Sequence, residues 1–213
     1  MSNPSSLVCL LTVSGLFLVW SLLHPVNYWV WLFEISAGVV GLAVLAATYR
    51  RFPFSRLVYV LVGIHFGVLA IAAKYTYAEM PLFNWLREAL GLARNHYDRV
   101  GHFFQGLVPA LITREVLLRQ TALKPGKLVS LLCVSVCLAF SALWELLEWG
   151  IAVAFYRENA AAWLGMQGDI WDAQWDMFMA LCGATFSIVF LSGVHDRSMA
   201  KVLREQDRVT AAR

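Results

Sequence analysis

The chain has 213 residues, of which 60% are apolar and 15% are charged, and its formal net charge is +3. A typical soluble domain carries about 25% charged residues, so this chain has too little polar surface to cover a core in water. The composition therefore excludes an ordinary water-soluble enzyme, a disordered chain and a nucleic-acid-binding protein, and it predicts a membrane domain with lipid as its partner.

Six apolar runs approach the length of about 20 residues that a membrane-spanning helix needs. The first lacks both a preceding basic residue and a following small-residue cleavage site, which indicates a retained helix rather than a signal peptide. The sequence predicts an all-α, polytopic bundle of six transmembrane helices over residues 1–195, followed by a basic cytoplasmic tail, 196–213. The expected helices cover residues 7–23, 28–48, 57–73, 100–118, 128–150 and 174–193.

The distribution of Lys and Arg predicts the orientation, because these residues concentrate in cytoplasmic segments. If the N-terminus is inside, the inner segments and the tail hold eleven basic residues and the outer segments hold five. We therefore expect both termini in the cytoplasm and the longest connection, 74–99, outside.

The outer connection is expected to contain a helix of its own. Pro81 suits the first turn of a helix, and apolar residues recur at helical spacing from Leu82 to Ala93. This pattern predicts an amphipathic helix that lies in the outer interface of the membrane. Polar residues take its other face: Asn84, Arg87, Glu88 and Arg94.

All nine tryptophans fall in the outer half of this topology, and two interpretations stay open. Because tryptophans gather at membrane interfaces, they fit a one-sided aromatic belt. They also fit an aromatic cleft that opens to the outer leaflet.

Ionisable side chains within a bilayer are costly, so each one needs a partner or a function. Asp98, His102 and Gln105 share one face of the fourth expected helix, because they are four and three residues apart. Acids in three other helices fall at a similar depth, in the outer half of the bundle. These residues are Glu34, Glu145, Glu148, Asp169, Asp172 and Asp176.

A group of carboxylates must take up protons or a cation when few bases lie nearby, and here only Arg99, Arg157 and His102 offer positive charge. Oxygen ligands with an imidazole suit divalent ions such as Mg²⁺, Mn²⁺, Ca²⁺ or Zn²⁺. We therefore expect a polar site that binds a divalent metal cation. Its expected metal ligands are Glu145, Asp172 and Asp176, its catalytic residues are His102 and Glu148, and its additional polar residues are Glu34, Asp98, Gln105 and Asp169.

Simpler interpretations stay open for some residues. Asp98 beside Arg99 also fits a solvated ion pair, and Asp169 also fits a cap of the sixth helix. Near the inner end, Glu115 and Arg119 are four residues apart, and we expect them to form a surface ion pair.

Most of these residues belong to three motifs: Tyr97-Asp98-Arg99-x-Gly101-His102-Phe103-x-Gln105-Gly106, Glu145-x-x-Glu148-Trp149 and Gln167-Gly168-Asp169-x-Trp171-Asp172-x-Gln174-x-Asp176-Met177. The motifs resemble those of the YjdF-type bacterial inner-membrane protein family. That resemblance implies a multi-pass protein of the inner membrane and implies no reaction. The second half is also similar to VanZ-like membrane proteins, in which an acid-bearing helix precedes a helix that opens with spaced Asp residues. This second likeness implies envelope or lipid-linked chemistry.

Three functions fit these observations. The first is a metal-dependent enzyme at the periplasmic face that acts on a lipid or lipid-linked substrate, with His102 as general acid or base. The second is a non-enzymatic protein whose polar cluster locks the helix ends together or docks a partner. The third is a proton- or cation-coupled transporter, which is expected to carry an internal repeat, and the sequence shows none.

Overall fold

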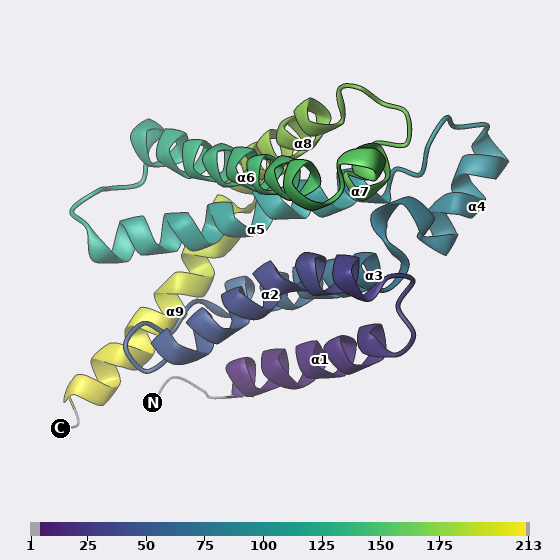
Figure 1. Cartoon of the computed structure of the whole chain (residues 1–213). Helices are drawn as coiled ribbons and strands as arrows, with labels where there is room; N and C mark the ends of the chain where they lie inside the picture. Colours follow the sequence, from purple (N-terminus) through teal and green to yellow (C-terminus); the bar gives the residue numbers. More distant parts are fainter. Residues whose placement is uncertain (1–4, 212–213) are drawn as a thin grey trace.

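The computed structural model describes residues 5–211, without the side chains of 162 and 209–211, and within that range all regular elements are helices (Figure 1). This confirms the all-α fold class. Five helical segments of the described chain are long and apolar enough to cross a membrane. They are α1 (Ser5–Leu22), α2 (Tyr28–Thr48), α3 (Arg56–Tyr75), α6 (Lys127–Phe155) and the segment Asp172–Arg208.

The remaining predicted span, the fourth in chain order, is α5 (Tyr97–Gln120), which packs against α3, α6 and α8 (Asp172–Phe186). This helix is less apolar than the other five because it carries charged residues near both ends. Asp98, Arg114 and Glu115 are nevertheless buried, so the polar side chains of α5 face other helices. Six membrane crossings stay a prediction.

The two ends of the described chain lie at the same end of the bundle. Figure 1 shows the start of α1 and the end of α9 (Ser192–Ala211) on one side, and α4 (Pro81–Leu90) on the opposite side. An even number of crossings would produce this arrangement, so it is compatible with α5 as a sixth span. Which end faces the cytoplasm stays a prediction from the basic residues.

That orientation can be tested at two exposed positions, Glu88 in α4 and Lys124 in the connection between α5 and α6. We expect a membrane-impermeant thiol reagent to label Glu88→Cys in intact cells and to label Lys124→Cys only after the cells are permeabilised. The measurement is a mass shift on a gel, with permeabilised cells as the control for reactivity. The opposite labelling pattern would place the candidate site in the cytoplasmic leaflet.

The helix expected to run towards Arg94 is shorter in the structure. It ends at Leu90 because Gly91 has a φ of 63°, a left-handed conformation that closes the helix. The chain then turns into the bundle, and Arg94 is only 5% exposed. The assignment of Arg94 to a polar face of this helix is therefore wrong, whereas the location of α4 in the membrane interface stays a prediction.

The last predicted span and the tail form one continuous helix. A π-helical turn, Ser187–Leu191, joins α8 to α9, and the expected end of the bundle at residue 195 falls within α9. The Leu57 backbone N–H donates a hydrogen bond of 3.2 Å to the Ser198 hydroxyl. The first part of the tail is therefore attached to α3.

The backbones of α5 and α8 approach each other closely at two glycines. A Cβ atom at Gly106 would lie 1.8 Å from the Ala180 carbonyl oxygen, and one at Gly183 would lie 1.9 Å from the Phe103 carbonyl oxygen. Because only glycine fits at either position, the two backbones touch there. This contact sets the distance between the charged residues at the starts of both helices.

A buried polar network lies at the other end of α5. Glu115 is fully buried, and it accepts hydrogen bonds from the Ser55 backbone N–H at 2.9 Å and from Arg119 at 2.5 Å. The Nε2 atom of His195, which is also fully buried, lies 2.9 Å from the second carboxylate oxygen of Glu115. The predicted ion pair between Glu115 and Arg119 is therefore confirmed, but its expected location at the surface is wrong, because residues distant in sequence cover it.

Candidate functional site

Two loops meet at the end of the bundle where α5 and α8 begin. The Asn95 backbone N–H donates to the side-chain oxygen of Gln167 at 2.9 Å, and the Gln167 amide donates to the Asn95 carbonyl at 3.0 Å. The fully buried Asn95 side chain also accepts a hydrogen bond of 3.0 Å from the Tyr97 N–H. These bonds fix the first turns of α5 and α8, which carry the charged residues of the site.

Two arginines lie among the carboxylates. Arg94 Nη1 is 2.5 Å from Asp172 Oδ1, and Arg99 Nη2 is 2.8 Å from the same oxygen. Arg99 also pairs with Asp176. Both guanidinium groups lie within 3.6 Å of two further carboxylates, Asp98 and Asp169.

Part of the positive charge of the site therefore comes from a different arginine than the sequence indicated. Arg94 is the base that sequence reasoning missed. Arg157, which was expected to contribute, is exposed and donates to the Val153 carbonyl near the end of α6 at 3.0 Å. Because two arginines share Asp172, this carboxylate needs no metal ion to balance its charge.

His102 lies where α5, α6 and α8 bring their carboxylates together. Its Nδ1 atom is 2.8 Å from the Gln105 side-chain oxygen, and its Nε2 atom is 3.3 Å from Asp98 and 3.7 Å from Asp176. Because an amide oxygen only accepts hydrogen bonds, Nδ1 carries a proton in this arrangement. Nε2 then faces two carboxylates, which is favourable when Nε2 is protonated or when a cation lies between them.

One group of described residues has the geometry to hold a metal ion. Asp98, His102 and Asp176 are buried, and each offers a ligand atom within 4.8 Å of the others. Two of the expected ligands lie outside this group. Asp172 is engaged by the arginines, and the Glu145 Oε1 atom lies 3.9 Å from His102 Nδ1 without a hydrogen-bond partner.

The remaining predicted residues surround this group. Glu148 accepts a hydrogen bond of 2.9 Å from the indole of Trp144 on its own helix. Asp169 accepts one of 2.9 Å from the Trp171 N–H just before α8, in addition to its contacts with the arginines. Glu34 of α2 lines a cavity to which His102 also contributes.

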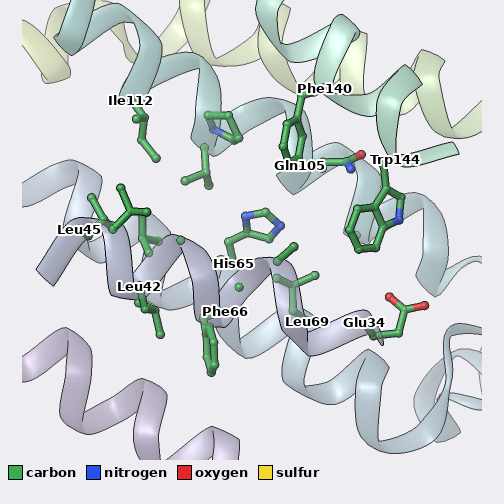
Figure 2. A pocket seen from close by; sticks show the side chains of 18 of the residues that line it. Glu34, Leu42, Leu45, His65, Phe66, Leu69, Gln105, Ile112, Phe140 and Trp144 are labelled. Atoms are coloured by element: carbon green, nitrogen blue, oxygen red, sulfur yellow. The ribbon is translucent and has the colours of Figure 1, made fainter. Parts of the chain in front are cut away.

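This cavity has a volume of about 340 Å³ and lies between α2, α3, α5 and α6 (Figure 2). Ligand pockets in proteins span about 300 to 1,000 Å³, so the cavity can accept a small molecule or part of a larger one. Glu34 and Trp144 lie at one end of it in Figure 2, and Leu45 and Ile112 lie at the other. The end that holds Glu34 is polar, and the other end is apolar.

Tyr77 adds a hydroxyl group to the wall of the cavity. It belongs to a short 3-10 helix, Tyr77–Glu79, and burial raises the pKa of its phenol well above the usual value. The phenol therefore stays protonated over the whole physiological pH range. A neutral hydroxyl here can donate a hydrogen bond to a bound molecule without adding charge.

Most of the tryptophans expected in the outer half lie on the surface. Trp29 is 70% exposed, and Trp85, Trp149 and Trp171 are each 60% to 62% exposed. Trp144, in contrast, lines the cavity. These exposures favour the aromatic belt over a cleft built from many tryptophans.

Comparisons with known proteins agree with a membrane location. The family model described as "Predicted membrane protein (DUF2238)" matches residues 6–197. The chain is 44% identical over 171 residues to the inner membrane protein YjdF of Escherichia coli (strain K12), and this alignment covers 80% of the chain and 81% of the relative. No solved structure matches the chain. The likeness to VanZ-like proteins stays a prediction.

Proposed function

Because the chain belongs to the DUF2238 family of predicted membrane proteins, we propose that it acts in the inner membrane. In this proposal the protein is an enzyme that uses a divalent cation on a lipid or lipid-linked substrate. The cation would bind to Asp98, His102 and Asp176, whose ligand atoms lie close enough together. The substrate would reach this group from the cavity.

The position of His102 carries this proposal. On one side its Nε2 atom faces two carboxylates, and on the other its side chain forms part of the cavity wall. Gln105 accepts a hydrogen bond from Nδ1–H, as a carbonyl or carboxylate does for most metal-binding histidines, and this leaves the Nε2 lone pair for a cation. A cation at this position would lie next to any molecule in the polar end of the cavity.

The proposed chemistry divides between the cation and two nearby acids. A bound divalent cation can polarise a phosphoryl or carbonyl oxygen, or lower the pKa of a bound water molecule. Glu145 has a buried oxygen atom without a hydrogen-bond partner, so it is the acid best placed to take up a proton. Glu148 is a second candidate for proton transfer, although it is engaged by Trp144.

A structural lock is the second candidate function, and the two arginines favour it. Arg94 and Arg99 pair with all four carboxylates at the starts of α5 and α8 and balance half of their charge without a metal ion. In this alternative, His102 is a protonated imidazole that bridges Asp98 and Asp176. The protein would then hold its helices together at this end and catalyse no reaction.

Metal retention distinguishes the two functions. We expect the purified protein in detergent, loaded with Mn²⁺ or Zn²⁺ and then desalted, to keep about one ion per chain by elemental analysis. Asp176→Asn and Asp98→Asn should weaken retention at least about tenfold. Retention should also fall as the pH falls, because the ligands must be deprotonated to bind the ion.

The control is Asp207→Asn, which changes an exposed aspartate of α9 far from the site and should leave retention unchanged. A wild-type protein that keeps neither ion, or an Asp176→Asn variant that keeps as much as the wild type, would contradict the metal-dependent enzyme and support the lock. Circular dichroism of each variant checks that the helices are intact.

A further inference from the structure

The cavity beside His102 has the length of one leaflet of a bilayer. Its lining on α2 extends from Glu34 to Leu45, eleven residues along the chain. At a rise of 1.5 Å per residue this span is about 16 Å. The hydrocarbon core of a bilayer is about 30 Å thick, so the cavity covers about half of it.

Three small residues form the central part of the wall on α2. Ala37, Gly38 and Gly41 line the cavity, and a Cβ atom at Gly41 would meet no other atom within 4 Å. Gly41 is also exposed. The cavity is therefore open along α2 in a part of the chain whose composition suits the lipid phase.

His65 places a polar atom in the middle of this apolar wall. Figure 2 shows its ring between the Glu34 end and the Leu45 end of the cavity, pointing into the space between the helices. The ring Nε2 atom is buried and has no hydrogen-bond partner among the described residues. A buried polar atom without a partner is unfavourable, so a molecule that fills the cavity gains from placing an oxygen atom there.

We propose that the cavity binds one acyl chain of an ester-linked membrane lipid, with the ester carbonyl hydrogen-bonded to His65 and the headgroup directed towards His102. The proposal rests on the proposed function, and it names the part of the substrate that the protein recognises. The apolar end, which includes Leu45, Val62 and Ile112, would hold the chain beyond the carbonyl. The polar end, with Glu34 and Tyr77, would contact the region next to the headgroup.

The test uses a phosphatidylglycerol probe that carries a photoreactive diazirine group on one acyl chain, reconstituted with the full-length protein in lipid nanodiscs. After illumination, the labelled residues are identified by peptide mass spectrometry. We expect labels on residues that line the cavity, and we expect Gly41→Leu, which fills open space, to reduce this labelling at least about fivefold. Gly150→Leu is the matched control, since a Cβ at exposed Gly150 also meets no atom within 4 Å and this residue lies outside the cavity.

A second probe with the same chain joined by an ether bond tests His65, because an ether lacks the carbonyl oxygen. We expect the wild type to label about fivefold less with the ether probe than with the ester probe, the effect of losing one hydrogen bond, and His65→Phe to label equally with both. Unchanged labelling in Gly41→Leu would overturn the acyl-chain site, and equal labelling of the wild type by both probes would overturn the role of His65. Asp176→Asn should label like the wild type, because the acyl-chain site does not need the metal ion. A negative metal-retention experiment would therefore leave the labelling result unchanged, and a negative labelling experiment would leave the metal-retention result unchanged.

Discussion

Replacing Glu115 by Ala is expected to destabilise the protein by about 3 to 5 kcal/mol, because the change leaves buried charged partners uncompensated. Arg119 and the Ser55 N–H donate to this carboxylate, and His195 lies 2.9 Å from it. Glu115 is fully buried, so water cannot replace the lost hydrogen-bond acceptor. Equilibrium unfolding of the purified protein in mixed detergent micelles measures the change in the free energy of unfolding.

The control for this experiment is Glu205→Ala in α9, which removes an exposed carboxylate and should change the free energy of unfolding by less than about 0.5 kcal/mol. Two variants of equal stability would show that Glu115 contributes no more than a surface acid does. His195 would then need another explanation for its complete burial.

Replacing Arg94 by Leu is expected to have an effect of the same size at the opposite end of α5. The change removes the guanidinium group of a residue that is 5% exposed and leaves the buried carboxylate of Asp172 with one arginine partner in place of two. We expect a loss of about 3 to 5 kcal/mol in the free energy of unfolding. The same variant should bind Mn²⁺ or Zn²⁺ more tightly than the wild type does, because a positive charge beside the proposed metal ligands is gone.

Arg157→Leu is the matched control, since Arg157 is exposed and, among the described residues, its side chain donates only to the Val153 carbonyl four residues earlier. It should change neither stability nor metal binding by a measurable amount. If Arg94→Leu proves as stable as Arg157→Leu, the arginine network at the start of α8 is not what holds these helix ends together.

Much of the helical framework could be predicted from the sequence, because its signal is local. The apolar runs that form α1, α2, α3 and α6 are long and uninterrupted, and hydropathy alone identifies them. The contact of His102 with Asp98 and Asp176 was also within reach. Helical spacing puts Asp98 and His102 on one face of the same helix. An even number of membrane crossings between His102 and Asp176 puts these two residues at the same end of the bundle.

The rest could not be predicted because it depends on contacts between distant segments. His195 lies 80 residues after Glu115 in the chain, and no spacing rule links them. Arg94 enters the site because the chain turns at Gly91, after a helix that was expected to continue. The local signal for this turn is Asn95, a polar residue between Arg94 and His96 just before α5. The existence of the cavity depends on the distance between α2 and the helices α5 and α6. This distance is set only when the whole bundle is assembled.

If α5 crosses the membrane, as the sequence predicts, its buried charges also determine when this helix becomes stable in the bilayer during biosynthesis. Charged side chains oppose the insertion of the helix that carries them until they find partners. The partners of Arg99 and Glu115 include Asp172 and His195, which the ribosome adds more than 70 residues later. The insertion of such a span would therefore be completed by α8 and α9, and the C-terminal part of the chain would finish the assembly of a helix made well before it.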